Sequence, residues 1–190
     1  MVNVVVSRYN EDLSWLSIVR HKKIVYNKGY VLGSDSIPLE NIGREAHTFL
    51  YHIVNNYFRL SDWTIFLQGH PFDHCSNIID LVNSFPEDDS RLCQLSSGCY
   101  SLSDKNLEEH QNDVEHLRVY SEKLYQQMFG SLKSYFVYSP GAQYIVHKNN
   151  ITNRPINFYS DILYNYDWKH DLPWSIERLW PDIFDTKIHS

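Results

Sequence analysis

The chain has 190 residues, of which 43% are hydrophobic and 15% aromatic, so it can bury a core and is not intrinsically disordered. Its 17 basic and 23 acidic residues give a net charge of −6, which argues against a nucleic-acid partner because such proteins need a basic face. No run of about 18 apolar residues is present, so the sequence predicts no transmembrane segment. Three scattered cysteines do not suit a disulfide framework or a cysteine zinc site, and we expect a reducing, cytoplasmic setting.

Strands and helices are expected to alternate along the first half of the chain. Short apolar runs bounded by polar turns predict three strands, over 2–6, 23–26 and 63–67. Asp12 is placed to cap a helix that follows it. Apolar residues recurring every three or four positions predict helices over 44–57 and 76–85, whereas 33–41 has the composition of a loop.

The second half continues with a long polar loop over 86–106. A surface helix over 107–128, two strands and two short helices follow, the last four over 135–138, 143–147, 156–165 and 174–184. This order predicts an α/β fold over 1–190, a single domain with a mostly parallel sheet flanked by helices. Ligands of such sheets bind beyond the carboxyl ends of the strands, where the polar clusters at 7–12 and 68–74 are expected.

The cluster after the first strand contains Arg8, Asn10 and Glu11. It is interpreted either as a turn with a helix cap or as a nucleotide or sugar contact. In the second case Arg8 would pair with a phosphate, and a carboxylate would accept a hydrogen bond from a base or a ribose hydroxyl.

The cluster after the strand over 63–67 contains Gln68, His70, Asp73 and His74. Imidazole and carboxylate groups suit a divalent metal, so the sequence predicts a site for Mn²⁺ or Mg²⁺ at His70, Asp73 and His74. The alternative is that Asp73 caps the helix that begins near Ser76.

Two further places are candidates for chemistry. Asn41 and Arg44 flank a glycine at the start of the clearest helix, where free amide groups favour anions, although an ordinary helix start gives the same pattern. Glu177 lies among aromatic residues on a predicted helix and is a candidate general base. Otherwise Glu177 is a surface residue paired with Arg178 or Lys169, or it accepts from a buried donor such as Arg154.

Several segments resemble the family catalogued as domain of unknown function 3431. The longest matching segments are Val5–Leu16, Ile24–Gly29, Asn41–Leu50 and Phe66–His74, and shorter ones are Gly141–Val146, Arg154–Pro155, Phe158–Tyr159 and Glu177–Trp180. The resemblance extends over most of the chain in the same order and weakens over 86–130. The family name implies no activity.

A looser resemblance is to nucleotide-sugar glycosyltransferases of the GT-A type. It is carried by a strand followed by Tyr9-Asn10-Glu11, by Asn41-Ile42-Gly43 before a helix, and by an apolar strand leading to Gln68. Such enzymes have an Asp-x-Asp metal motif after that strand, and here Gln68-Gly69-His70 stands in its place. The resemblance implies a GT-A-like fold, a nucleotide-sugar donor bound by Arg8, Asn10, Glu11, Asn41, Arg44 and Gln68, a glycan or other hydroxyl acceptor, and Glu177 as catalytic base.

Sugar transfer from a nucleotide donor to a hydroxyl acceptor is therefore the expected function. A metal at Asp73 with His70 or His74, or else Arg8 and Arg44, would neutralise the departing diphosphate. Two alternatives remain open. One is a metal-dependent hydrolase that uses His70, Asp73 and His74, and the other is a non-catalytic carbohydrate-binding module, which the many aromatic residues would suit.

Overall fold

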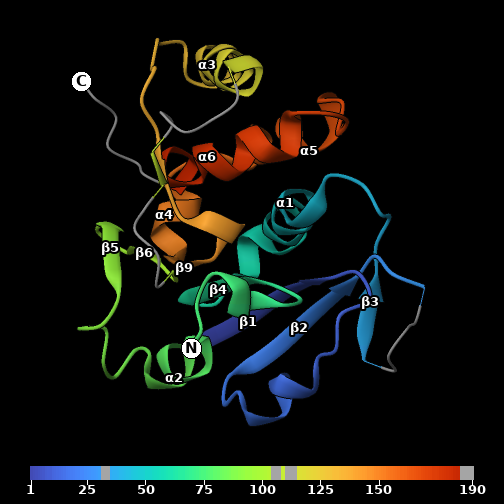
Figure 1. Ribbon diagram of the computed structural model, residues 1–190, viewed down its shortest axis with the longest axis vertical. Coiled ribbons are helices and arrows are strands. Elements are labelled where there is room, and N and C mark those ends of the chain that lie inside the picture. Colours follow the sequence, from blue (N-terminus) through green and yellow to red (C-terminus); the bar gives the residue numbers. More distant parts are fainter. Residues whose placement is uncertain (31–34, 104–107, 110–114, 185–190) are drawn as a thin grey trace.

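The computed structural model describes residues 1–30, 35–103, 108–109 and 115–184 (Figure 1). The first half of the chain forms β1 (Val2–Arg8), β2 (Lys22–Asn27), β3 (Ser36–Pro38), α1 (Arg44–Asn56), β4 (Trp63–Gln68) and α2 (Ile78–Ser84). The second half forms β5 (Cys93–Ser96), β6 (Cys99–Ser101), β7 (Glu108–Glu109), α3 (Glu115–Phe129), β8 (Val137–Tyr138), β9 (Tyr144–His147), α4 (Lys148–Thr152), α5 (Ile156–Asn165) and α6 (Leu172–Phe184).

Seven strands form one mixed sheet in the order β3-β2-β1-β4-β9-β6-β5. β1 is parallel to β2 and to β4, with Val5 opposite Ile24 on one side and Phe66 on the other, and β3 extends this parallel half. β9 is antiparallel to β4, and β6 and β5 continue the antiparallel half. The expected neighbouring strands 2–6 and 63–67 are confirmed.

The expectation of a mostly parallel sheet is wrong. Among the described strands, three pairings of the large sheet are antiparallel, and so is the separate β7–β8 pair. Apolar patterning reports the burial of a strand but not its direction. A chain that returns through the Gly98 turn between β5 and β6 can add antiparallel strands, because such strands need only a short connection.

Side chains of the central strands alternate between two apolar layers. Val4 and Val6 face the layer formed with α2 and the 3₁₀ turn Ser14–Ile18, whereas Val5 and Phe66 face the layer formed with α1, α5 and α6. Figure 1 shows α1, α5 and α6 stacked on one side of the sheet and α2 on the other. This alternation has the period of two that a strand imposes on its side chains.

α1 is the helix that the periodicity predicted most clearly. Phe49, Leu50 and Ile53 are fully buried, and the rings of Phe49 and Phe66 lie 4.8 Å apart. The expected packing of the helix over 44–57 on the sheet is therefore confirmed. The spacing of these residues produces the apolar stripe with which a helix covers a sheet.

Other elements differ from expectation at their ends or in kind. The segment after Asp12 forms the 3₁₀ turn Ser14–Ile18, and the expected loops contain β3, β5 and β6. These strands have three or four residues, which is too short for a visible alternation. α3 begins at Glu115, and the expected start at Leu107 lies outside the described residues. Within the described ranges, we find no helix of the length and apolar character needed to cross a membrane.

Candidate functional site

A polar cleft of about 290 Å³ lies beyond the carboxyl ends of β1 and β4. After β1 the chain adds β2 as the neighbour on one edge of β1, and β4 later pairs with the opposite edge of β1. Open α/β sheets bind ligands at such a reversal of strand order. The cleft is lined by Ser7, Arg8, Tyr9, Glu11, Lys28, Asn41, Arg44, Glu45, Gln68, Gly69, His70 and Asp73.

Most of the residues predicted from the sequence meet in this cleft. Those that line it are Arg8, Glu11, Asn41, Arg44, Gln68, His70 and Asp73. Asn10 lies beside the lining and accepts a hydrogen bond from the Tyr30 amide on its Oδ1, at 3.1 Å. The ring of His74 packs against Gly141, and Glu177 is buried in α6.

The turn after β1 is held by its own side chains. The Nε of Arg8 donates to the Glu11 carbonyl at 3.0 Å, and its Nη1 donates to Asn27 Oδ1 at 2.6 Å. Glu11 accepts from the Tyr9 amide at 2.6 Å and lies so close to Gly69 that a Cβ there would be 2.5 Å from Glu11 Oε2. The turn therefore fixes Arg8 and Glu11 at the mouth of the cleft.

The loop before α1 is held by the buried side chain of Lys28. The sequence pattern did not predict Lys28 as a site residue. Its Nζ donates to the carbonyls of Ile42 and Arg44, each at 2.5 Å. Burial lowers the pKa of Lys28 to about 8. Gly43 and Arg44 have φ of +62° and +50°, a conformation that side chains disfavour and that these contacts hold. The sequence does contain a signal for Lys28. It comes directly after β2, at the same end of the sheet at which Arg8 ends β1.

Arg44 connects the cleft to α6. Its guanidinium lies 4.0 Å from the centre of the Trp174 ring, and its Nε lies 3.6 Å from Glu45 Oε2. About half of the Arg44 side chain remains exposed. Stacking on an aromatic face orients a guanidinium without neutralising it, so Arg44 keeps a positive charge at the cleft.

Two carboxyl groups are buried next to this cation. Glu177 accepts from the Gly141 amide on Oε1 at 2.7 Å, and burial, followed by the nearby charge of Glu45, raises its pKa to about 7. Burial also raises the pKa of Glu45. Glu177 is therefore not a surface residue, and Arg154 donates instead to the carbonyls of Asp182 and Ile183.

Glu45 was not predicted as a site residue, although the sequence contains a signal for it. It precedes Phe49 by four positions and Ile53 by eight, so it lies in the apolar stripe of α1. A charged residue in such a stripe is buried by the packing of the helix. Because burial of a carboxyl group needs a compensating partner or a proton, this position is a candidate for function.

The residues present do not fit the predicted metal site. His70 Nε2 and Asp73 Oδ1 lie 3.6 Å apart, but both side chains are largely exposed and His74 packs against Gly141 instead. The described part of the chain has no group of three or more His, Cys, Asp or Glu that could hold a metal ion. Asp73 does not cap α2 either, because that helix begins at Ile78 with Asn77 at its N-cap.

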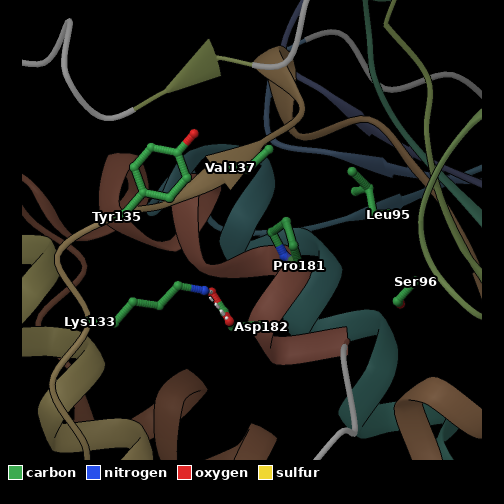
Figure 2. Close-up of a pocket in the computed structure, with 7 residues that line it drawn as sticks. All are labelled: Leu95, Ser96, Lys133, Tyr135, Val137, Pro181 and Asp182. Carbon is green, nitrogen blue, oxygen red and sulfur yellow. Dashed lines mark hydrogen bonds and ion pairs between the residues drawn. The ribbon is translucent and has the colours of Figure 1, made fainter.

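A second pocket, of about 190 Å³, lies at the end of α6 (Figure 2). Lys133 and Asp182 point towards each other across it, and Lys133 Nζ donates to both carboxylate oxygens at 2.6 and 2.7 Å. Tyr135, Val137 and Pro181 also line it. This ion pair joins the segment after α3 to α6. We therefore interpret the pocket as a structural contact and the cleft as the candidate functional site.

Comparison with known proteins supports one of the two resemblances. The family described as "Protein of unknown function (DUF3431)" matches residues 4–85, which is just under half of the chain. This span contains every residue that lines the cleft, but not Glu177. No curated protein matches the chain, and no solved structure matches it, so no comparison supports the likeness to GT-A enzymes. Over residues 4–85 the chain is similar to a family whose description names no activity.

Proposed function

We propose that the cleft binds a nucleotide-sugar and transfers its sugar to a hydroxyl acceptor such as a glycan, in the manner of a GT-A-like enzyme. One observation carries this proposal: two arginines and the buried carboxyl group of Glu45 line one cleft at the carboxyl ends of β1 and β4, and a second buried carboxyl group, Glu177, lies behind Glu45 within its electrostatic reach. Transfer from a nucleotide donor needs both kinds of group, because a diphosphate leaves and an acceptor hydroxyl loses a proton.

The departing diphosphate would be stabilised by fixed positive charge. Arg8 is oriented by its bonds to Glu11 and Asn27, and Arg44 is oriented by Trp174. Guanidinium groups suit this role because they bind phosphate oxygens in a bidentate manner. The start of α1 adds the partial positive charge of a helix N-terminus on the same side of the cleft.

The acceptor proton would go to the buried carboxyl groups, Glu45 and Glu177. A general base works best when its pKa is near the working pH, and the pKa of Glu177 is raised to about 7. In an inverting transfer the acceptor oxygen forms its bond to the sugar as it loses this proton, and the nucleoside diphosphate leaves from the opposite face. We also propose a cytoplasmic location, which suits three free cysteine thiols.

The alternative functions have less support than sugar transfer. A metal-dependent hydrolase needs ligands that converge, and His74 packs away from the His70–Asp73 pair. A carbohydrate-binding module would not need two buried carboxyl groups beside a cation. We therefore derive no step through a metal, and the arginines carry the charge of the leaving group in the proposed reaction.

Binding of nucleotide-sugars tests the proposal directly. We expect a uridine or guanosine diphosphate sugar to raise the melting temperature of the full chain in a thermal-shift screen. Arg8→Gln and Arg44→Gln should each weaken binding roughly 10- to 100-fold by calorimetry, because hydrogen bonds to charged groups contribute about 1.5–3 kcal/mol. Screening with and without Mn²⁺ shows whether the donor brings a metal with it.

Arg118→Gln is the matched control. Arg118 is paired with Glu122 on α3, and it does not line the cleft, so its variant should bind the donor as the wild type does. The proposal is wrong if no nucleotide-sugar stabilises the wild type, or if the two cleft variants bind as tightly as the Arg118 variant.

A further inference from the structure

We infer that Glu45 and Glu177 form one carboxylate pair, in which Glu45 contacts the substrate and Glu177 acts through Glu45. The inference rests on the proposed function and deepens it, because it moves the contact with the acceptor from α6 to α1. Glu45 is then the catalytic residue, and Glu177 is a positioning residue that controls its proton.

Contacts before and after the pair bring its two helices together. Arg44 at the start of α1 lies 4.0 Å from the Trp174 ring of α6. Five residues further along α1 and six further along α6, the rings of Phe49 and Trp180 lie 6.0 Å apart. The carboxylate pair lies between these two contacts on both helices. α1 and α6 are therefore packed against each other at this level, and the charge of Glu45 acts on the Glu177 carboxyl group across this contact.

The two members of the pair differ in their access to the cleft. Glu45 lines it, with 7% of the residue exposed. Glu177 is as buried, does not line the cleft, and has one carboxylate oxygen bound by the Gly141 amide. A substrate in the cleft therefore contacts Glu45, whereas Glu177 contacts no substrate and acts only on Glu45.

The surroundings of the pair favour one shared proton near neutral pH. The charged and titratable groups that act on it from the packed elements are Lys28, Arg44, Arg178 and Tyr144, and His74 packs on Gly141, whose amide binds Glu177. Arg44 and Arg178 lower the pKa of Glu177, but burial and the charge of Glu45 outweigh them. Two buried carboxyl groups that repel each other lose their protons in separate steps, so one ionises while the other stays neutral.

The pair performs its part of the reaction without any other reagent. The acceptor hydroxyl gives its proton to the Glu45 carboxylate while its oxygen forms the bond to the anomeric carbon of the sugar. The bond from that carbon to the diphosphate oxygen breaks, and its electron pair leaves with the nucleoside diphosphate. Protonated Glu177 lowers the cost of the Glu45 charge before the transfer, and the proton on Glu45 returns to water afterwards.

Carboxyl ¹³C NMR of the full chain tests the coupling without any sugar donor. We expect Glu45→Gln to lower the titration midpoint of Glu177, because the variant removes the charge that opposes ionisation of Glu177. Glu177→Gln should change the midpoint of Glu45, because it removes the group that shares the proton of the pair. The second variant keeps the test valid if the first does not fold. Glu40→Gln, at an exposed position before α1, should change neither midpoint. Midpoints that stay unchanged in both pair variants would overturn the inference and leave the proposed function standing.

Turnover then separates the roles of the two residues. With the donor that binds, Glu45→Gln should lower kcat about 10²- to 10⁴-fold while donor binding persists, as expected for loss of a general base. Glu177→Gln should keep measurable turnover and shift the acidic limb of the pH–kcat profile. Unchanged turnover in the Glu45 variant, or an unchanged pH profile in the Glu177 variant, contradicts the inference. A wild type without transfer but with coupled midpoints contradicts only the proposed function.

Discussion

His52 is buried in α1 as a neutral side chain. Its Nδ1 lies 3.1 Å from the Tyr26 hydroxyl and 3.3 Å from Asn56 Nδ2, so both neighbours can donate to it and the proton belongs on Nε2. Burial, with a smaller contribution from the charge of Arg59, lowers the pKa of His52 from 6.5 to about 4. Protonation of this ring would therefore break a buried hydrogen bond.

This shift predicts how stability depends on pH. Between about pH 6.5 and 4 the unfolded chain binds more protons at this site than the native chain, so His52 makes the native state lose stability as the pH falls, on the order of 3 kcal/mol in all. His52→Gln should lower stability at pH 7 but reduce the further loss between pH 7 and 4.5, as measured by urea unfolding. An equal loss in variant and wild type over that range would contradict the shift.

Individual site residues differ in how far the sequence could predict them. Arg8 and Gln68 end β1 and β4, and His70 lies two residues beyond β4. The ends of parallel neighbours meet at one edge, so strand identity was enough to bring these residues together. Burial sets the chemistry of Glu45 and Lys28. The apolar stripe of α1 indicates the burial of Glu45, whereas that of Lys28 comes with its bonds to the Ile42 and Arg44 carbonyls, which the sequence does not predict. Sequence position gives a charged residue's place on an element, but its exposure is decided by tertiary packing.

At the scale of elements, β1, β2, β4 and β9 were predictable as strands, whereas β3, β5 and β6 and the direction of the antiparallel pairings were not. β1 and β4 are continuous apolar runs, and the stripe of α1 has one clear period. β6 is only three residues long and is paired through both edges, so its place depends on β9 and β5 rather than on its own sequence. Long-range pairing of this kind leaves no local signal.

The loop before α1 is an element whose shape can be tested. Gly43 and Gly130 both have positive φ, at +62° and +72°. A Cβ on Gly43 would lie 2.4 Å from the Trp168 ring, whereas a Cβ on Gly130 at the end of α3 meets nothing within 4 Å. Gly130→Ala therefore isolates the backbone cost, and Gly43→Ala adds a steric clash to it.

We expect Gly130→Ala to cost about 1 kcal/mol of unfolding free energy, the usual penalty of a left-handed residue with a side chain. Gly43→Ala should cost about 2–4 kcal/mol, because Trp168 or the start of α1 must move as well. Urea unfolding followed by tryptophan fluorescence measures both values. Equal losses in the two variants would mean that Trp168 does not hold this loop.

At the scale of the whole molecule, the apolar layer formed with α1, α5 and α6 contains residues from both halves of the chain. It begins with Val5 of β1 and ends with Phe184 of α6. The ring of Phe66 stacks on that of Phe184 at 5.9 Å with an interplanar angle of 7°, and Phe49 contacts Trp180. The segment that resembles the uncharacterised family, residues 4–85, therefore supplies the cleft lining but only part of the core beneath it.

This dependence predicts that residues 1–85 do not fold alone and that 1–190 unfolds as one domain. The fragment lacks β9, α5 and α6, so Phe49 and Phe66, both fully buried in the whole chain, would lose the aromatic partners that cover them. Small domains need a closed apolar core to offset chain entropy, and this fragment would have an open one.

We expect the ¹H–¹⁵N NMR spectrum of the 1–85 fragment to show the narrow dispersion of an unfolded chain, with the full chain as the dispersed control. A well-dispersed spectrum of the fragment, or unfolding of the full chain in two steps when fluorescence and circular dichroism are compared, would show that the cleft belongs to an independent N-terminal unit.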